Sequence, residues 1–201
     1  FSPNTTGDAL ASSIAFFLFL EKIGKKVDIV SDEFEIPTKF KFLSKWEHIK
    51  SQMSYLQKFI ISIDIKDLGI EELNYDVQHE KLRIFVTPEK GFITEKHIKT
   101  AQTSFKYDLI ITVDTPDLVS LGEVYTKHKD LFLTIPVINI DQHSENEHYG
   151  HINYTDIVVT STAELIFKLI KKIDKEVIDK NIATELLTGA IAKTKSFKAI
   201  D

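Results

Sequence analysis

Cysteine is absent from the 201-residue chain, which excludes disulfide bonds and metal sites built on thiolates. The absence is compatible with a reducing compartment, and we expect a cytoplasmic protein. Long hydrophobic runs are missing too, because the most apolar run, Ile14 to Leu20, is far shorter than the roughly 20 residues that span a bilayer. We therefore expect a soluble protein with no membrane partner.

The chain also lacks an excess of basic charge. Its formal net charge is -5 and its pI is about 5.8, so the sequence as a whole does not indicate nucleic-acid binding. A local basic groove stays open as an alternative. The hydrophobic content of 43% and the charged content of 27% are those of an ordinary globular protein. The length fits one large α/β domain or two small domains.

The first third of the chain predicts a buried helix and a strand. Residues 8–23, DALASSIAFFLFLEKI, are apolar on nearly every side, which is typical of a helix covered by other layers, and Gly24 ends it. Residues 27–31, VDIVS, predict a strand. The loop SPNTTGDALASS before the helix is small and polar, as a phosphate-binding loop would be. The alternative is a helix-capping loop with Asp8 near the positive helix end.

Residues 59–105 predict a small antiparallel insertion. Three β-rich runs, FIISIDI, ELNYDV and KLRIFVTP, are separated by turns at residues 67–69 and 78–80. Residues 94–105 predict a short helix.

Two later apolar runs, residues 108–114 and 134–141, each end in an aspartate. Continuous apolar runs are typical of parallel strands that are covered on both faces. Residues 118–132 supply a helical crossover between them. Ligands bind beyond the carboxyl ends of parallel strands, so Asp114 and Asp141 are expected on one rim of the sheet.

The helices that follow have clear beginnings. Ser161 to Glu164, Ser-Thr-Ala-Glu, is a capping box that opens a helix over residues 163–173. A further helix is expected at about residues 177–192.

The aspartate rim and the nearby histidines predict a metal site of the kind that a two-metal phosphoesterase needs. Carboxylate oxygens suit magnesium and manganese, and manganese also accepts imidazole. Three histidines, His143, His148 and His151, lie in the loop after the second aspartate. The alternatives are an aspartate that begins a turn and three solvent-exposed histidines.

Five motifs occur in an order that resembles the DHH superfamily of phosphoesterases, which includes oligoribonuclease/phosphatase proteins and RecJ-like exonucleases. The first four are SPNTTGDALAS (2–12), ITVDTPD (111–117), INIDQHSENEHYGHIN (138–153) and the Ser-Thr-Ala-Glu helix start (161–164). The last is GAIAKTKSF (189–197). Within the third motif, Asn146, Gly150 and Asn153 match the family's Asn, Gly and Asn. The resemblance covers the chain apart from the β-rich stretch.

The resemblance implies two manganese ions, but most of the positions that would bind them have changed. The first ion would be held at three positions, which are Ser2, Thr6 and Asp114 in this chain. The second would be held at four positions, which are Asp8, Asp114, Gln142 and Lys193. The first site therefore keeps one family ligand of three, and the second keeps two of four. By the same resemblance, Asp141 supports the site and His143 faces the substrate phosphate.

Lys193 is the most telling of these changes, because it puts a cation where the family has a carboxylate. We expect its ammonium group to lie between Asp8 and Asp114, where it would compensate two carboxylates that the family neutralises with metal. The alternative is a match displaced by a residue or two, with Lys193 in solvent. No Asp or Glu lies between Thr188 and Ile200 to restore the ligand.

The sequence thus predicts a doubly wound, mainly parallel α/β domain of the DHH type over residues 1–201, with a β-rich insertion at about 59–105. The family's smaller C-terminal domain is expected to be absent. We expect a catalytically impaired domain that keeps a nucleotide- or phosphate-binding or scaffolding role, with no bound Mn²⁺. A short oligonucleotide, a protein partner or a second copy are the expected partners. The alternative is an active Mn²⁺-dependent phosphoesterase with a reduced metal site.

Overall fold

The computed structural model describes residues 1–3, 6–53 and 56–198. The chain divides into two compact units, one formed by Phe1–Ser54 with Tyr107–Asp201 and the other by Tyr55–Lys106. The division falls close to the expected limits of the β-rich insertion. Each unit is described below by itself.

The first unit is built on a parallel sheet. Three strands follow one another in space as in the sequence: β7 (Ile110–Val113), β8 (Val137–Asp141) and β9 (Ile152–Thr155). A separate parallel pair joins β1 (Ile29–Val30) to β2 (Ile49–Lys50). The two apolar runs do form neighbouring parallel strands, so the expected mainly parallel α/β architecture is confirmed.

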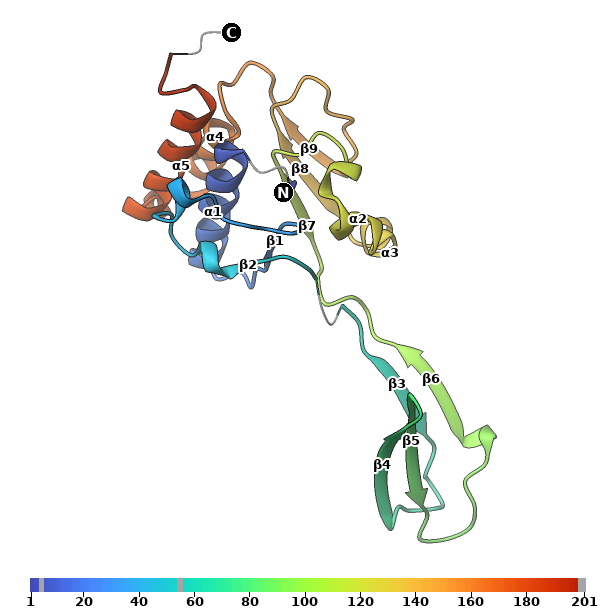
Figure 1. The fold of residues 1–201 in the computed structure, drawn as a ribbon. Helices are drawn as coiled ribbons and strands as arrows, with labels where there is room; N and C mark the ends of the chain where they lie inside the picture. The colour runs from blue at the N-terminus through green and yellow to red at the C-terminus, as the bar shows by residue number, and fades with distance from the viewer. Residues whose placement is uncertain (4–5, 54–55, 199–201) are drawn as a thin grey trace. The chain divides into compact units, whose positions relative to one another are not determined.

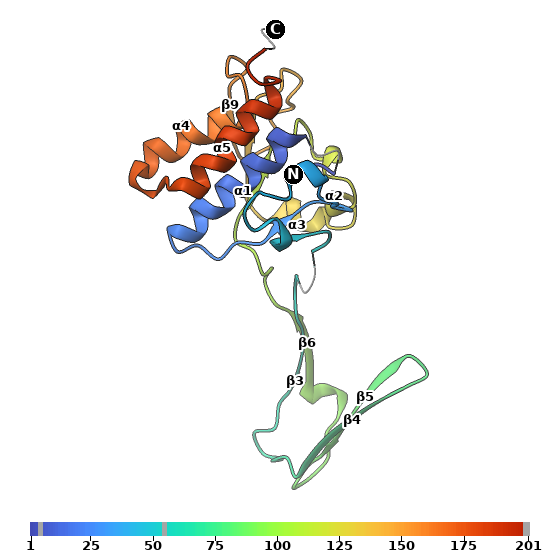
Figure 2. The same ribbon diagram turned by 60° about the vertical axis from the view of Figure 1, so that its left-hand side comes forward.

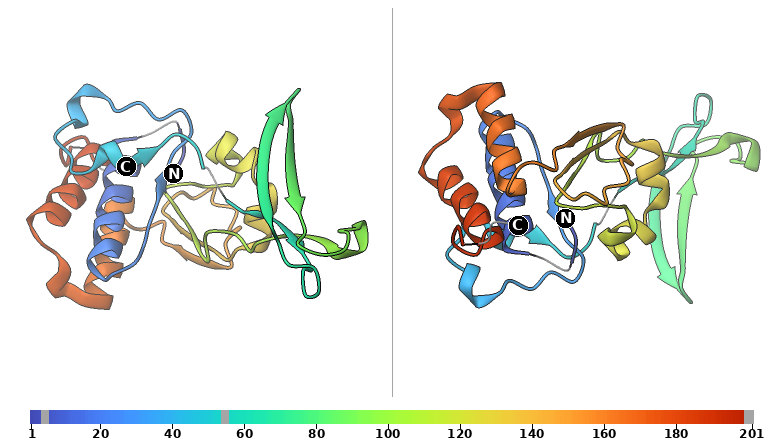
Figure 3. Two further views of the ribbon diagram at one scale, coloured as in Figure 1. Left: turned by 90° about the horizontal axis from the view of Figure 1, so that it is seen from below. Right: turned by 90° about the horizontal axis from the view of Figure 1, so that it is seen from above.

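Helices lie on both sides of this sheet (Figure 1). One side carries the three longer helices, α1 (Gly7–Lys22), α4 (Thr162–Asp174) and α5 (Lys180–Lys193). The other side carries the two short helices of the crossover between β7 and β8, which are α2 (Glu123–Thr126) and α3 (Lys129–Thr134). Figure 3 shows the same two layers from below and from above.

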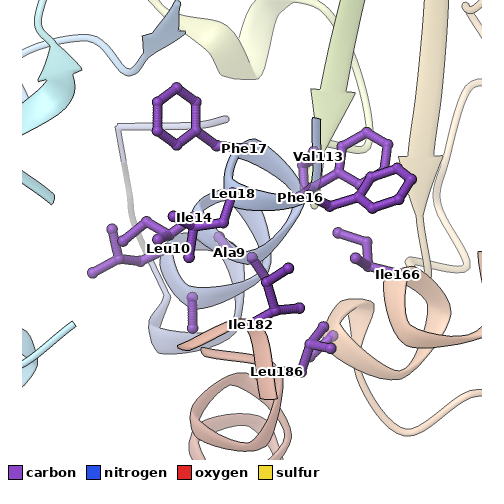
Figure 4. Packing of buried hydrophobic residues seen from close by; sticks show 14 of the residues in the cluster. Ala9, Leu10, Ile14, Phe16, Phe17, Leu18, Val113, Ile166, Ile182 and Leu186 are labelled. Atoms are coloured by element: carbon purple, nitrogen blue, oxygen red, sulfur yellow. The ribbon is translucent and has the colours of Figure 1, made fainter. Parts of the chain in front are cut away.

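Helix α1 is the centre of the core. Its residues from Asp8 to Phe19 are all buried, as expected for a helix that is apolar nearly all round. Ile182 and Leu186 of α5 and Ile166 of α4 pack in the same hydrophobic cluster (Figure 4). The helix ends where Gly24 adopts a positive φ of 76°, which glycine does at little cost.

Short 3₁₀ helices connect the longer elements of this unit. They are η1 (Thr38–Phe40), η2 (Trp46–His48), η4 (Val119–Leu121) and η5 (Lys175–Val177). No helix in the described residues is long and apolar enough to cross a membrane.

The second unit consists of two antiparallel strand pairs (Figure 2). Strand β3 (Phe59–Ile63) pairs with β6 (Ile98–Gln102), and β4 (Glu72–Gln78) pairs with β5 (Lys81–Thr87). His79 and Glu80 form the two-residue turn of the β4–β5 hairpin, both with positive φ, as tight hairpin turns require.

The helix predicted at residues 94–105 was wrong. Only a single 3₁₀ turn, η3 (Glu95–His97), forms there, and it is capped by Thr94. The residues after it become β6, because pairing with β3 satisfies their backbone groups along five residue pairs. A tertiary partner thus outweighed a weak local helix preference.

Candidate functional site

Asp114 and Asp141 lie side by side on one rim of the sheet. Strands β7 and β8 are parallel and place Val113 opposite Ile140, so the next residue of each strand is an aspartate at the carboxyl end. Both carboxylates are buried. Asp114 leaves its strand with a φ of 53°, a left-handed conformation that aspartate tolerates better than most residues.

Asp8 reaches this rim from the first turn of α1. Its side chain is fully buried and is hydrogen-bonded by the beginning of α4: the backbone N–H of Thr162 donates to Oδ2 at 2.7 Å, and that of Ala163 donates to Oδ1 at 3.0 Å. The Ser12 hydroxyl donates to Oδ1 at 3.0 Å. The N–H groups at a helix N-terminus carry partial positive charge, so this helix end stabilises the carboxylate.

Two threonine hydroxyls hold Asp114. Thr162 Oγ1 donates to Oδ1 at 2.5 Å, and Thr6 Oγ1 donates to Oδ2 at 3.2 Å. Thr6 is also the N-cap of α1, because its hydroxyl oxygen accepts from the backbone N–H of Ala9 at 3.0 Å. A position that the resemblance assigns to a metal ligand therefore caps a helix and orients Asp114.

The two carboxylates affect one another electrostatically. Burial, and secondarily the negative charge of Asp114, raise the pKa of Asp8 to about 6, although the hydrogen bonds from Thr162, Ala163 and Ser12 act in the opposite direction. The hydrogen bonds thus compensate only part of the cost of burying this charge.

His143 is held by Asp141. The distance between His143 Nδ1 and Asp141 Oδ1 is 2.7 Å, and Asn146 Nδ2 donates to the other oxygen, Oδ2, at 2.6 Å. The hydrogen bond to Asp141 raises the pKa of His143 above its usual value, against the opposing effects of partial burial and of the positive charge of Lys193. The imidazole is therefore positioned with a preference for its charged form.

The Asn, Gly and Asn of the third motif shape the loop. Asn146 Oδ1 accepts from Asn139 Nδ2 and from the backbone N–H of His148, both at 2.8 Å. Asn153 Oδ1 accepts from Gly150 N at 3.0 Å, and its Nδ2 donates to two carbonyl oxygens of the loop. These side chains replace the missing backbone partners of an irregular segment.

The two outlying histidines do not join the rim. His151 Nδ1 accepts from the backbone N–H of Val137 at 3.1 Å, at the amino end of β8 and so at the other end from Asp141. His148 lies in the loop with a φ of 53°. The structure thus brings together Asp8, Asp114, Asp141 and His143.

The other predicted positions lie around this group. Gln142 is buried, and its Nε2 donates to Asp8 Oδ2 at 3.5 Å. The Ser2 carbonyl oxygen accepts from Ser31 Oγ at 3.3 Å, beside β1. Asn4 and Thr5 of the first motif lie outside the described residues.

Lys193 ends α5 and is half-buried. Its charge acts on His143, but among the residues that the structure describes no ion pair joins it to Asp8 or Asp114. The expected place of the ammonium group between these carboxylates stays a prediction. The N–H groups of Thr162 and Ala163 donate to both oxygens of Asp8, which offsets part of the cost of burying this carboxylate.

Sequence reasoning missed Thr162, Ala163 and Ser12 as partners of the carboxylates. The sequence predicted a capping box, and one of its two hydrogen bonds forms: Ser161 Oγ accepts from Glu164 N at 3.1 Å. The Glu164 carboxylate accepts from Thr160 N rather than from the N-cap residue. The capping box marks where α4 begins, but it does not show which carboxylate the helix end faces.

One cluster of three side chains has the donor set of a metal site. A ligand atom from each of Asp114, Asp141 and His143 lies within 4.8 Å of the others. The full two-ion set does not fit, because Ser2, Thr6, Gln142 and Lys193 stand at four of its positions and the oxygens of Asp8 are hydrogen-bonded within the protein. A single ion fits the three-residue cluster if it displaces the His143–Asp141 hydrogen bond.

A parallel α/β domain with carboxylates beyond its strand ends is an arrangement that metal-dependent phosphoesterases use. The family model described as "DHH family, N-terminal domain" matches residues 3–190, and the chain belongs to that family. The family is metal-dependent and acts on phosphate esters. A search of curated protein sequences found no match.

Among solved structures, the chain is similar to an exopolyphosphatase-related protein from Bacteroides fragilis, with a TM-score of 0.62 and 20% sequence identity. The similarity covers 95% of this chain and 44% of that protein, so the chain spans less than half the length of this relative. At this identity the likeness establishes the fold.

Proposed function

We propose that this DHH-family domain has little or no hydrolytic activity and keeps a role in binding a nucleotide or a short oligonucleotide in the cytoplasm. One observation carries the proposal. The carboxylates that remain from the family's metal-binding set accept hydrogen bonds from protein donors. The beginning of α4 and Ser12 donate to Asp8, and Thr6 and Thr162 donate to Asp114. These donors offset part of the cost of burying the two carboxylates without a metal ion.

The expected loss of activity follows from the number of missing ligands. A two-metal phosphoesterase uses one ion to activate the attacking water and both to stabilise the charge that develops on the phosphate. Manganese would supply this chemistry if it were bound. With four of the ligand positions changed, we expect the protein not to hold the two ions together, and so not to activate the attacking water.

The binding role rests on the groups that would face a phosphate. The His143 side chain is 24% exposed, Asp141 fixes its orientation, and its pKa is raised. Lys193 adds a second positive charge nearby. A fixed imidazolium and an ammonium group suit a phosphate oxygen, which accepts charge-assisted hydrogen bonds.

An activity assay tests the loss of hydrolysis. The protein is incubated with Mn²⁺ and a panel of dinucleotides, 3′-phosphoadenosine phosphate and pyrophosphate, with the Asp114→Ala variant as the control. We expect the same background rate for both proteins. Mn²⁺-dependent turnover that disappears in Asp114→Ala would overturn the proposal.

A binding assay tests the retained role. We expect a labelled dinucleotide to bind the protein without Mn²⁺, and the affinity to fall about tenfold in Lys193→Ala, because one charge-assisted contact is lost. Lys195→Ala, which changes an exposed lysine two residues away, is the matched control. Equal affinities for the two variants would remove Lys193 from the pocket.

A second candidate function is an active phosphoesterase with a single manganese ion. The clustering of Asp114, Asp141 and His143 favours it. The alternative ligand set is a reduced form of the family's second site, with Asp8, Asp114 and Gln142 joined by His143. Calorimetric titration with Mn²⁺ separates these ligand sets. Binding that is lost in Asp141→Asn but kept in Asp8→Asn supports the three-residue cluster, and the opposite result supports the family positions.

A further inference from the structure

The β4–β5 hairpin of the second unit has one face made only of apolar side chains. The strand register pairs every second residue across the hairpin, and three successive pairs on this face are apolar. The pairs are Leu73 with Val86, Tyr75 with Ile84, and Val77 with Leu82. We call these six side chains the apolar face.

The opposite face of the hairpin is polar and satisfied within itself. Arg83 donates from Nε to Asp76 Oδ1 at 2.8 Å and from Nη2 to Oδ2 at 2.5 Å, a bidentate pair. The same guanidinium lies 5.5 Å from the centre of the Phe85 ring, and Asn74 donates to Glu72. The polar side chains of this face thus interact with one another, whereas the other face carries only apolar side chains.

The apolar face is largely open to water. Leu73, Tyr75, Val77, Leu82 and Ile84 are exposed by between 44% and 76%. A two-stranded hairpin is only marginally stable by itself, because a third strand or a packed layer is needed to bury its apolar side. The structure thus leaves the apolar face of this hairpin exposed among the described residues.

We propose that this surface packs against the same surface of a second copy of the chain. The face carries no charge, so it offers nothing to a nucleic acid and can meet its own copy without repulsion. The five most exposed of these side chains bury roughly 500 Å² of apolar surface on each copy, or about 1,000 Å² in total, which is at the lower limit of area for a specific interface.

The order of the side chains also fits a two-fold axis. An axis parallel to the strands sets each residue of β4 opposite its own cross-strand partner in β5 of the second copy. Each facing pair then joins a larger side chain to a smaller one: Leu73 with Val86, Tyr75 with Ile84, and Leu82 with Val77. Alternation of large and small residues across facing positions is what lets two layers interdigitate.

Light scattering with size-exclusion chromatography tests the proposal on the wild-type protein and two matched variants. We expect a dimer for the wild type in the micromolar range. Tyr75→Glu places a charge at the centre of the apolar face and should weaken the dimer at least 30-fold, because a central aromatic side chain dominates such interfaces. Phe85→Glu makes the same kind of change on the polar face and should leave the dimer intact. A monomeric wild type, or equal loss of the dimer in both variants, would overturn the proposal.

Cross-linking gives an answer even if Tyr75→Glu does not fold. The chain has no cysteine, so Val77→Cys introduces a single thiol at little change in volume on the apolar face. A short bismaleimide should join two such chains into a covalent dimer, because stacked sheets lie only about 10 Å apart. Phe85→Cys, on the other face, should stay unlinked. Failure of Val77→Cys to cross-link would contradict face-to-face packing.

Discussion

Asp8 receives hydrogen bonds from two different helices, and this decides what the residue does in the protein. The Ser12 hydroxyl comes from its own helix, whereas the N–H groups of Thr162 and Ala163 come from α4. A carboxylate that binds a metal ion needs an oxygen that is accessible to the ion. Asp8 instead joins α1 to α4, so we regard it as a residue of the packed interior.

The carboxylates of this site could be predicted from the sequence, but their partners could not. Asp114 and Asp141 were foreseen because each follows an apolar strand, and parallel strands end at a common rim. The donation from Thr162 to Asp114 depends on how α4 is placed against β7, which no local pattern encodes. For the same reason the sequence did not indicate that the beginning of α4 donates to Asp8.

The substitution Lys193→Asp tests the match between this chain and the family's metal positions. It removes a positive charge and adds a carboxylate, so we expect Mn²⁺ to bind at least tenfold more tightly. Calorimetric titration at fixed pH and ionic strength measures the change. Lys195→Asp makes the same charge change at an exposed position and should have a much smaller effect. Unchanged Mn²⁺ binding in Lys193→Asp would mean that the position does not face the rim.

Glu185 gives the protein a dependence on pH that is separate from the site. Its side chain is fully buried in α5, Oε1 accepts from Ser44 N at 2.7 Å, and Oε2 has no partner among the described residues. Burial raises the pKa of this carboxyl above its usual value. The folded state therefore binds the proton more tightly than the unfolded state does. The stability that this group contributes is present in acid and is lost as the pH rises through the raised pKa.

The substitution Glu185→Gln removes this titration. We expect the free energy of unfolding of the variant to rise relative to that of the wild type as the pH increases from 4 to 8. A difference in the free energy of unfolding that is the same at every pH reflects the new buried amide group. Only the part of the difference that changes with pH is therefore used. Urea unfolding at several pH values measures it, with Glu47→Gln at an exposed position as the control for buffer effects. A constant difference across this range would refute the assignment.

At the scale of elements, the first turn of α4 faces the Asp8 carboxylate with two backbone N–H groups. Close packing supports this arrangement: a Cβ atom added to Gly189 of α5 would lie 2.7 Å from Ala163 Cβ and 2.9 Å from Asp8 Oδ1. The three helices therefore meet at Asp8, where only a residue without a side chain fits on α5.

Removal of the Asp8 carboxylate should accordingly destabilise the fold. In Asp8→Ala the buried N–H groups of Thr162 and Ala163 lose their acceptor, and we expect a loss of about 2 kcal/mol in the free energy of unfolding even after the repulsion with Asp114 is relieved. Ser12→Ala, which loses a single hydrogen bond to Asp8, should cost about 1 kcal/mol. Urea unfolding measures both. A more stable Asp8→Ala would show that Asp8 is an unused ligand.

Some elements could be predicted from the sequence and others could not, for a physical reason. Helix α1 and strands β7 and β8 could be predicted from their own residues, because these elements carry apolar side chains on the sides that are buried in the fold. Strand β6 has a mixed pattern, IKTAQ, which favours neither a helix nor a strand by itself. Its conformation comes from β3, which is distant in sequence.

At the scale of the whole molecule, the folding energy is concentrated in the first unit. Every residue of the hydrophobic core cluster lies before residue 55 or after residue 106. The two chain segments that lead into the second unit are hydrogen-bonded to one another, with Lys106 N donating to Leu56 O at 2.7 Å and Thr103 N to Lys58 O at 2.9 Å. The second unit is therefore an insertion whose first and last residues lie next to each other.

This arrangement predicts that the first unit folds without the insertion. Lys58 and Thr103 are joined as the ends of a two-residue hairpin are, so residues 59–102 can be replaced by Asn-Gly. We expect the shortened chain to unfold cooperatively with a Tm within about 5 °C of the wild type, because no core residue is lost. We also expect it to be a monomer, since the apolar face is gone. A shortened chain that is folded and still dimeric would place the interface in the first unit, and one that is unfolded would show that the two units depend on each other.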